Sequence, residues 1–366
     1  SGCTLHAPTE VELSVDPPTE YLEDRSSGDS GLPLEEWWLA FNDEHLNLLM
    51  EELFAQNLDL KQSIARLEQV EAAFKITRSA QSPTVSAGGS LGRSQQPGVA
   101  DDFTGNNQQL SLSAGYELDL WGRLSSQSRA AELELSASRR DLQTLYLGLS
   151  ARLADFYFVA VEQRAQLVLT EQSIASFADT LARVENRYRL GLVPAVDTYQ
   201  ARQNLSAARA VWALFESALA EAEHAIAVLV GRYPERSSGG SLEQLPVPPG
   251  LFSTGLPGEL ISQRPDLQAA LERVKAADAR VAAAIADRFP SISLSGGYGS
   301  LRQDVAAGLI KGEFWSLLGN LVLPVVDGGR RRAEVDRQEA ALREAVAGYQ
   351  QKVLSAFLDV EDALVN

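Results

Sequence analysis

The sequence predicts a mainly helical protein with a smaller paired-strand part, built as a tandem repeat. Long stretches have apolar residues at helical spacing, and two pairs of shorter stretches alternate as strands do. The stretch SPTVSAGGSLG at 82–92 aligns with FPSISLSGGYG at 289–299, an offset of 207 residues. Matches such as Gly122 with Gly329 recur at that offset over about a hundred residues, so each repeat is a helix, strand, strand, helix unit.

Composition places the chain among folded proteins and excludes several functions. Of its 366 residues 45% are hydrophobic and 22% are charged, and the formal net charge is −17. The one tight basic run, Arg330 to Arg332, is too small for a nucleic-acid surface. No run of about 18 apolar residues predicts a transmembrane helix, although a transmembrane barrel would leave no such run.

The first repeat is expected over residues 43–231, after an N-terminal segment at 1–42. Its first helix should span about 43–80, with an interruption at 57–59 where Asp59 can cap a new helix. The next helix, about 123–190, has no proline and would reach roughly 100 Å, which is typical of a coiled-coil-like rod.

The rod should end in a turn within RLGLVP. Gly191 suits a left-handed helix end and Pro194 suits the first turn of a returning helix at about 194–230. Residues 232–265 are rich in Pro, Gly and Ser and are expected to form a connector. The second repeat follows at 266–366. A copy of full length would run to about residue 438, so the second repeat is expected to be incomplete.

Strands are expected at about 83–95, 108–121, 290–302 and 313–326. In QLSLSAGYELDLWGR, one face carries Leu110, Leu112, Ala114, Tyr116 and Leu118, and the other carries Ser111, Ser113, Gly115, Glu117 and Asp119. Such a strand faces either lipid and a wet lumen or the core and surface of a soluble sheet. Two isolated hairpins would leave strand edges unpaired, which neighbouring chains could cover.

These stretches resemble the TolC/OprM-like outer-membrane factors, the outer-membrane efflux proteins. The resemblance covers nearly the whole chain and rests on motifs in the family's order: EEWWLAFNDEHLNLLMEEL, YELDLWGRL, RYRLGLVPAVDTYQARQNLSAARA, GLPGELISQRPDL, FPSISLSGGYG and PVVDGGRRRAEV. It implies a homotrimer in which each chain gives four strands to a twelve-stranded β-barrel in the outer membrane. The helices would form an α-helical tunnel through the periplasm.

The resemblance implies a passive conduit in a tripartite efflux system. Its partners would be a periplasmic adaptor protein, an inner-membrane pump of the RND type and outer-membrane lipid, with no nucleic acid and no cofactor. The alternative is a structural or interaction lipoprotein, a periplasmic coiled-coil rod without a pore. The exported substrate stays open, although the single methionine, Met50, argues against copper.

Three sites follow from this resemblance. Cys3, after Ser1 and Gly2, would carry the lipid anchor of the NodT-type lipoprotein branch, behind a signal peptide that is not in this chain. The adaptor would dock at the helical tip: Arg189, Leu190, Gly191, Leu192, Val193 and Asp197. Ser111, Ser113, Glu117 and Asp119 would face the lumen, while Leu110, Leu112, Ala114, Tyr116 and Leu118 would face lipid.

Enzymatic readings have little support in the sequence. His6, His45 and His224 are scattered with no carboxylate at metal-ligand spacing, so we expect no catalytic residue and no metal site. The acidic constriction that closes the tunnel in the family would lie in the part of the second repeat expected beyond Asn366. No gate residue can therefore be named in this chain.

Overall fold

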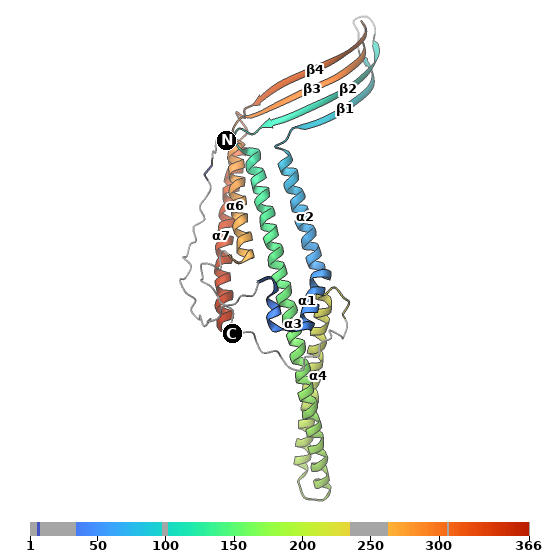
Figure 1. Cartoon of the computed structure of the whole chain (residues 1–366), viewed down its shortest axis with the longest axis vertical. Coiled ribbons are helices and arrows are strands. Elements are labelled where there is room, and N and C mark those ends of the chain that lie inside the picture. Colours follow the sequence, from blue (N-terminus) through green and yellow to red (C-terminus); the bar gives the residue numbers. More distant parts are fainter. Residues whose placement is uncertain (1–5, 8–33, 97–101, 235–262, 306, 366) are drawn as a thin grey trace. The chain divides into compact units, whose positions relative to one another are not determined.

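The computed structural model describes residues 6–7, 34–96, 102–234, 263–305 and 307–365. The chain divides into two compact units made of interleaved segments. One unit takes Arg66–Asp141 and Leu256–Asn366 together with the first residues of the chain. The other takes Asp24–Ala65 and Leu142–Gly255. Each unit therefore contains residues that precede helix α3 (Arg123–Arg189) in the sequence and residues that follow it. Figure 1 shows α3 as one uninterrupted ribbon.

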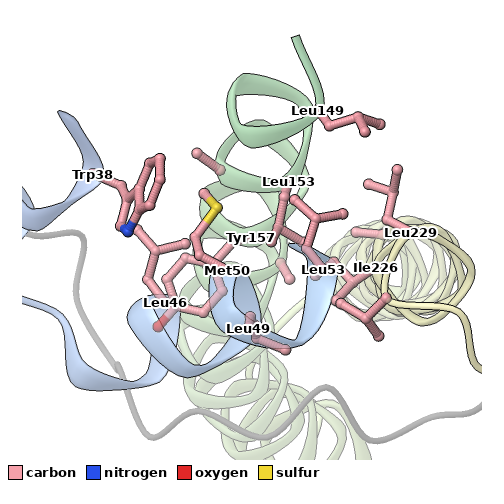
Figure 2. Packing of buried hydrophobic residues seen from close by; sticks show 14 of the residues in the cluster. Trp38, Leu46, Leu49, Met50, Leu53, Leu149, Leu153, Tyr157, Ile226 and Leu229 are labelled. Atoms are coloured by element: carbon pink, nitrogen blue, oxygen red, sulfur yellow. The ribbon is translucent and has the colours of Figure 1, made fainter. Parts of the chain in front are cut away.

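The second unit is a helical bundle with an aromatic-rich core. It contains the 3-10 helix η1 (Leu34–Phe41), α1 (Glu44–Gln56), the start of α2 (Leu58–Ser79), the later part of α3 and α4 (Ala195–Leu229). Figure 2 shows Trp38, Leu46, Tyr157 and Ile226 converging in this core from η1, α1, α3 and α4. The hydroxyl of Tyr157 donates to the Asp43 carboxylate at 2.6 Å, and burial raises the pKa of Tyr157.

The break between α1 and α2 is capped by Asn57, so the expectation that Asp59 caps the new helix was wrong. The Asn57 side-chain oxygen accepts from the backbone N–H of Leu60 at 2.8 Å. Its amide nitrogen donates to the carbonyl of Leu229 at 2.8 Å. Asn57 is buried, and only a side chain with both a donor and an acceptor satisfies both backbone groups there.

The sequence analysis found no stretch apolar enough for a membrane span, but the long helix α3 contains one that passes this test by length and composition. One 18-residue stretch in it has a mean hydropathy of 1.2, apolar enough for a span by length and composition. Leu149, Leu153, Tyr157 and Val161 lie on one face of this helix and are buried in the core of the second unit. Packing within the protein accounts for this apolar face, and we assign no membrane span to α3.

The first unit joins a β-sheet to helices. Helices α6 (Pro265–Ala286) and α7 (Arg330–Val365) pack through a core that includes Leu267, Val274, Val281 and Tyr349. Buried alanines along α6 let neighbouring helices approach closely. Ion pairs from α6 to the first part of α3 support this packing, as in Arg280 with Glu134 at 2.7 Å.

The described strands form one antiparallel sheet in the order β1-β2-β3-β4. They are β1 (Thr84–Gln96), β2 (Phe103–Leu118), β3 (Ser291–Val305) and β4 (Gly308–Val322). The expected ranges 108–121 and 313–326 for the second strand of each pair were displaced, because β2 and β4 begin and end earlier. The expected bounds were based on alternating apolar residues, which occupy only part of each strand. Hydrogen bonding continues through polar residues such as Asn106 and Gln108, which have no core to face.

Candidate functional site

The register of the sheet extends the two faces of β2 across all four strands. Leu112 lies between Ala87 and Tyr298, and Tyr298 lies opposite Trp315. We call this the apolar face; its apolar side chains come from Val85, Ala87, Leu91, Leu110, Leu112, Ala114, Tyr116, Leu118, Ile292, Leu294, Tyr298, Trp315, Leu317 and Leu321. Many are open to solvent in the single chain, with Leu112 exposed by 52%, Leu317 by 72% and Trp315 by 78%.

The opposite face is mostly small and polar on three of the four strands, with Leu301 of β3 as an exception. It carries Ser86, Ser90, Asn107, Gln109, Ser111, Ser113, Glu117, Ser293, Ser295 and Gln303. The hydroxyls of Ser86 and Ser113 share a hydrogen bond of 2.7 Å across β1 and β2. Strand β4 departs from the pattern with Phe314 and Leu318 on this face. A Cβ at Gly299 would lie 2.8 Å from the ring of Phe314 and 2.5 Å from the Leu110 carbonyl oxygen, so this position needs glycine.

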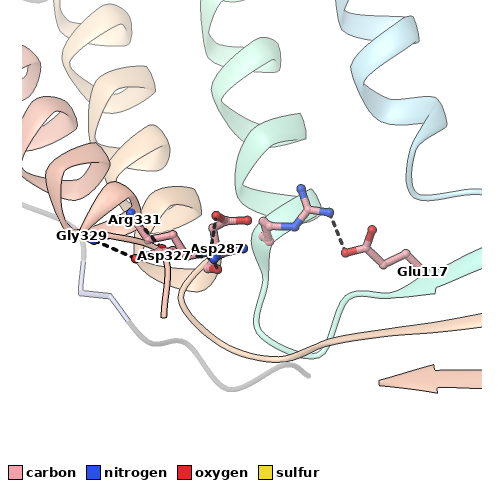
Figure 3. Close-up of polar contacts among 6 residues, drawn as sticks. Glu117, Asp287, Asp327, Gly329 and Arg331 are labelled. Atoms are coloured by element: carbon pink, nitrogen blue, oxygen red, sulfur yellow. Dashed lines mark hydrogen bonds and ion pairs between the residues drawn. The ribbon is translucent and has the colours of Figure 1, made fainter. Parts of the chain in front are cut away.

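The junction between β2 and α3 is held by two acidic side chains with different roles. Arg123, at the start of α3, donates to Glu117 at 2.6 Å, the contact that Figure 3 draws as a dashed line. Asp119 accepts the backbone N–H groups of Leu124 and Ser125 at 3.0 and 2.7 Å. Burial raises the pKa of Asp119, but these hydrogen bonds outweigh it and the net pKa is lowered.

The expectation that Asp119 lies on a strand, with its side chain on the same face as Glu117, is therefore wrong. Strand β2 ends at Leu118, and the chain leaves the sheet before Asp119. The alternation of apolar and polar residues includes Asp119 in the sequence, but Asp119 is polar because it caps α3 and not because it lies on the polar face of the strand. The placement of Ser111, Ser113 and Glu117 on one face of β2 and of Leu110, Leu112, Ala114, Tyr116 and Leu118 on the other follows from the register.

The corresponding junction at α7 is also capped by an acidic residue. Asp327 accepts the backbone N–H groups of Gly329 and Arg331 at 3.1 and 3.2 Å, and Figure 3 shows these groups together. Arg331 reaches the end of α6, where it donates to the backbone and side-chain oxygens of Asp287 at 2.8 and 3.1 Å. The sequence analysis missed this contact, since only the tertiary fold places residue 331 beside residue 287.

A stacked aromatic pair joins the two repeats at the same end of the sheet. The ring of Trp121 stacks on Phe289 with centroids 5.1 Å apart. Its indole N–H donates to the carbonyl of Pro290 at 2.7 Å. Trp121 belongs to the first repeat and the other two residues belong to the second. The only sequence signal was an aromatic residue at each strand end, which does not reveal the pairing.

The turn between α3 and α4 has the geometry expected for a glycine helix end. Gly191 has a φ of +70°, Leu192 N–H donates to the Arg187 carbonyl at 2.9 Å, and Gly191 N–H donates to the Tyr188 carbonyl at 2.9 Å. This is a Schellman motif. Leu190 and Leu192 project from it, exposed by 74% and 63%.

The other tip residues surround these two leucines. Arg189 is exposed and donates to the side chain of Asn186. Val193 and Asp197 are half-buried, and Asp197 lies in the first turn of α4, where its carboxylate suits the positive end of the helix dipole. Pro194 precedes the first helical residue, Ala195, rather than lying in the helix.

The remaining sequence-predicted residues lie apart from these features. Cys3 is outside the described residues. The Nε2 of His6 lies 2.8 Å from a carboxylate oxygen of Asp278, while His45 and His224 are on α1 and α4. Within the part of the chain that the structure describes, no three His, Cys, Asp or Glu side chains are grouped so as to hold a metal ion.

Comparison with known proteins places this architecture in a family. The family model described as outer membrane efflux protein matches residues 49–232 and 256–366. The pyoverdine export outer membrane protein OpmQ of Pseudomonas putida is 30% identical over 98% of this chain and 78% of its own length. The probable outer membrane lipoprotein SilC of Salmonella typhimurium is 29% identical over 90% of this chain and 71% of its own.

A solved structure agrees with the sequence comparisons. The outer-membrane channel OprN superposes with a TM-score of 0.86 at 29% identity, over 99% of this chain and 82% of that one. Fold, strand arrangement and sequence thus lead to one assignment. The chain belongs to the outer membrane efflux protein family and is the outer-membrane channel component of an efflux system.

Proposed function

We propose that three copies of this chain close their sheets into one twelve-stranded barrel that forms the exit of a passive export conduit. The single observation that carries the proposal is the sheet itself. Its outer strands β1 and β4 each have one edge without a partner strand among the described residues, and every residue of β4 is exposed. Open edges favour pairing with another chain, and closure removes them.

The two faces of the sheet give the barrel its orientation. The apolar face would contact lipid through Leu110, Leu112, Ala114, Tyr116 and Leu118 and their neighbours on the other strands. The polar face would line the bore, with Ser111, Ser113 and Glu117 on β2. Alternation of this kind separates lipid from water in barrels of 8 to about 26 strands, a range that includes twelve.

The tip of the α3–α4 hairpin would be the docking site for a periplasmic adaptor protein, which connects the channel to an inner-membrane pump of the RND type. Arg189, Leu190, Gly191, Leu192, Val193 and Asp197 make up this site. Leu190 and Leu192 support the proposal because they are exposed beside a sharp turn and have nothing to cover them in the described part of the chain. Apolar side chains in such a position suit the end of a helical partner.

Cys3 would carry a lipid that anchors the N-terminal segment to the outer membrane. Its position directly after Ser1 and Gly2 supports this, as does the description of SilC as a lipoprotein. His6, three residues later, contacts Asp278 of α6.

The oligomer formed by the chain in detergent tests the proposal. We expect a band of three chains that resists dissociation on a gel without heating and collapses to one chain on boiling. Reconstituted protein should also conduct ions across a planar bilayer. A chain that is monomeric in detergent and passes no current would favour the alternative, a periplasmic coiled-coil lipoprotein without a pore.

A further inference from the structure

Two basic side chains face each other on the apolar face of the sheet. Arg302 on β3 lies directly opposite Lys311 on β4, and Gln108 on β2 lies opposite Arg302 on its other side. Residues opposite one another in an antiparallel pair have Cβ atoms about 4.5 to 5.5 Å apart, and like charges in this position destabilise the sheet. A negative charge in contact with both side chains would offset this repulsion.

The nearby acidic groups are hydrogen-bonded to neutral donors and not ion-paired with Arg302 or Lys311. Glu313 accepts a hydrogen bond from the hydroxyl of Tyr298 at 2.9 Å. Asp304 accepts from the side-chain amide of Asn106 at 3.0 Å. Arg302 and Lys311 make no ion pair with a carboxylate within 4.0 Å in the part of the chain that the structure describes. Both are exposed, so an external anion can reach them.

A trough of about 720 Å³ lies over the same region. Its walls include Leu91, Gln108, Leu110, Arg302, Lys311 and Glu313, all on the apolar face in two successive rows of the sheet. The row between them forms the floor. The trough thus has donors for an anion and, beside them, the start of the apolar rows that contain Trp315 and Leu317.

The height of the basic pair fits a lipid headgroup, if the sheet is the barrel proposed above. Ile292 begins the apolar rows of β3 and Arg302 follows ten residues later, which at about 3.3 Å per residue is about 33 Å along the strand. With a strand tilt of about 40°, this corresponds to about 25 Å along the membrane normal, the height of the apolar band in such barrels. Helices adjoin the other end of the strands, so the pair would lie toward the outer surface.

We propose that Gln108, Arg302 and Lys311 bind the phosphate of an anionic lipid headgroup in the outer leaflet, with the lipid's acyl chains lying along Trp315, Leu317 and Leu112. Phosphate oxygens accept charge-assisted hydrogen bonds from the guanidinium and the ammonium. The acyl chains would lie against the apolar rows between the basic pair and the end of the strands that adjoins the helices. This site rests on the proposed barrel and adds to it a specific lipid, held at each chain.

Native mass spectrometry of the purified chain in neutral detergent tests the site. The probe is a bisphosphorylated lipid A, compared with the same lipid after removal of its phosphates. Arg302→Gln combined with Lys311→Gln should bind the phosphorylated lipid at least about tenfold more weakly, because both charged donors to the phosphate are lost; tenfold corresponds to about 1.4 kcal/mol. The wild-type chain should bind the dephosphorylated lipid about tenfold more weakly than the phosphorylated lipid.

A charge-matched control separates this site from general electrostatics. Lys75→Gln combined with Arg183→Gln removes two exposed cations that sit on helices α2 and α3 in pairs with Glu71 and Asp179. This variant should retain the lipid as the wild-type chain does. Equal loss in the control, or equal binding of both lipids by the wild-type chain, would overturn the proposal. Displacement of the lipid by inorganic phosphate alone would show a free-anion site and would equally overturn it.

The same spectra report the number of chains. A monomer would refute the proposed barrel. A trimer that keeps the phosphorylated lipid in the double variant would refute only the lipid site.

Discussion

Asp119 and Asp327 perform the same task at different positions of the repeat. Each accepts backbone N–H groups at the start of the helix that follows a strand. Asp119 precedes the repeat-matched Gly122 by three residues, whereas Asp327 precedes Gly329 by two. A fixed offset of 207 residues therefore does not align the two caps. What both junctions share is the physical need to satisfy free donors at a helix N-terminus.

Replacement of Asp119 should destabilise the chain in a pH-dependent way. Asp119→Ala removes the cap of α3 and should cost about 1 kcal/mol, while Asp119→Asn keeps an acceptor and should cost less. The folded-state pKa of Asp119 lies below its ordinary value of 3.8. The carboxylate's contribution is therefore fully present above pH 3.8 and is lost as the pH falls through the lower folded-state value.

Thermal unfolding followed by circular dichroism measures this contribution. The difference in melting temperature between wild type and Asp119→Ala should be largest near neutral pH and should shrink below pH 3.8. A difference that is constant between pH 7 and pH 3 would contradict an ionised cap at this position.

Gly191 is a residue whose backbone conformation sets the shape of the proposed docking tip. With a φ of +70°, Gly191→Val would force a β-branched residue into a strained left-handed conformation. We expect export, measured as drug resistance of a strain that depends on this channel, to fall sharply while the trimer persists on a gel. Gly191→Asn is the matched control, because asparagine tolerates this conformation and should retain export.

The two Gly191 variants separate the turn from the rest of the chain. Full drug resistance in the Gly191→Val strain would show that the adaptor does not depend on the shape of this tip for docking. Loss of the trimer would show instead that the turn matters for assembly.

At the scale of an element, β2 offers the sharpest test of the barrel. Leu112 and Ser113 are neighbours on opposite faces of the sheet, and both are exposed in the single chain. An arginine facing lipid near the bilayer midplane costs about 2 to 4 kcal/mol in each chain. Leu112→Arg should therefore strongly reduce the detergent-stable trimer recovered from outer membranes. Ser113→Arg should assemble and change only conductance.

This pair of variants has an outcome that excludes the barrel. A soluble sheet with both faces in water would accept arginine at either position. Equal amounts of membrane-extracted trimer from the two variants, close to the wild-type amount, would show that neither face of the sheet contacts lipid.

At the scale of the whole molecule, the compact units do not follow the sequence repeats. The first unit combines the strands of both repeats with α6, α7 and the start of α3, while the second combines Asp24–Ala65 with Leu142–Gly255. The stacking of Trp121 on Phe289 shows how one repeat completes the other. An expected division at about residues 43–231 and 266–366 describes the repeated pattern, whereas compactness depends on which segments meet in space.

The sequence by itself determined the periodic features of this protein. Helical spacing without proline predicted the long helix that the structure has at Arg123–Arg189, and Gly191 in RLGLVP predicted a left-handed turn, which its φ confirms. The family followed from motifs in order, and the comparisons confirm it. These features are local, because periodicity and backbone preference act over a few residues.

Only the tertiary structure decided the pairings. Asn57 caps α2 through the nearby Leu60 N–H, but the second partner of its side chain, the carbonyl of Leu229, lies far along the chain. Asp119 belongs to a helix cap, and Arg302 meets Lys311 through strand register. Neither polarity nor spacing identifies a partner across the fold, because a polar residue looks the same in sequence whether it faces water, caps a helix or opposes a charge.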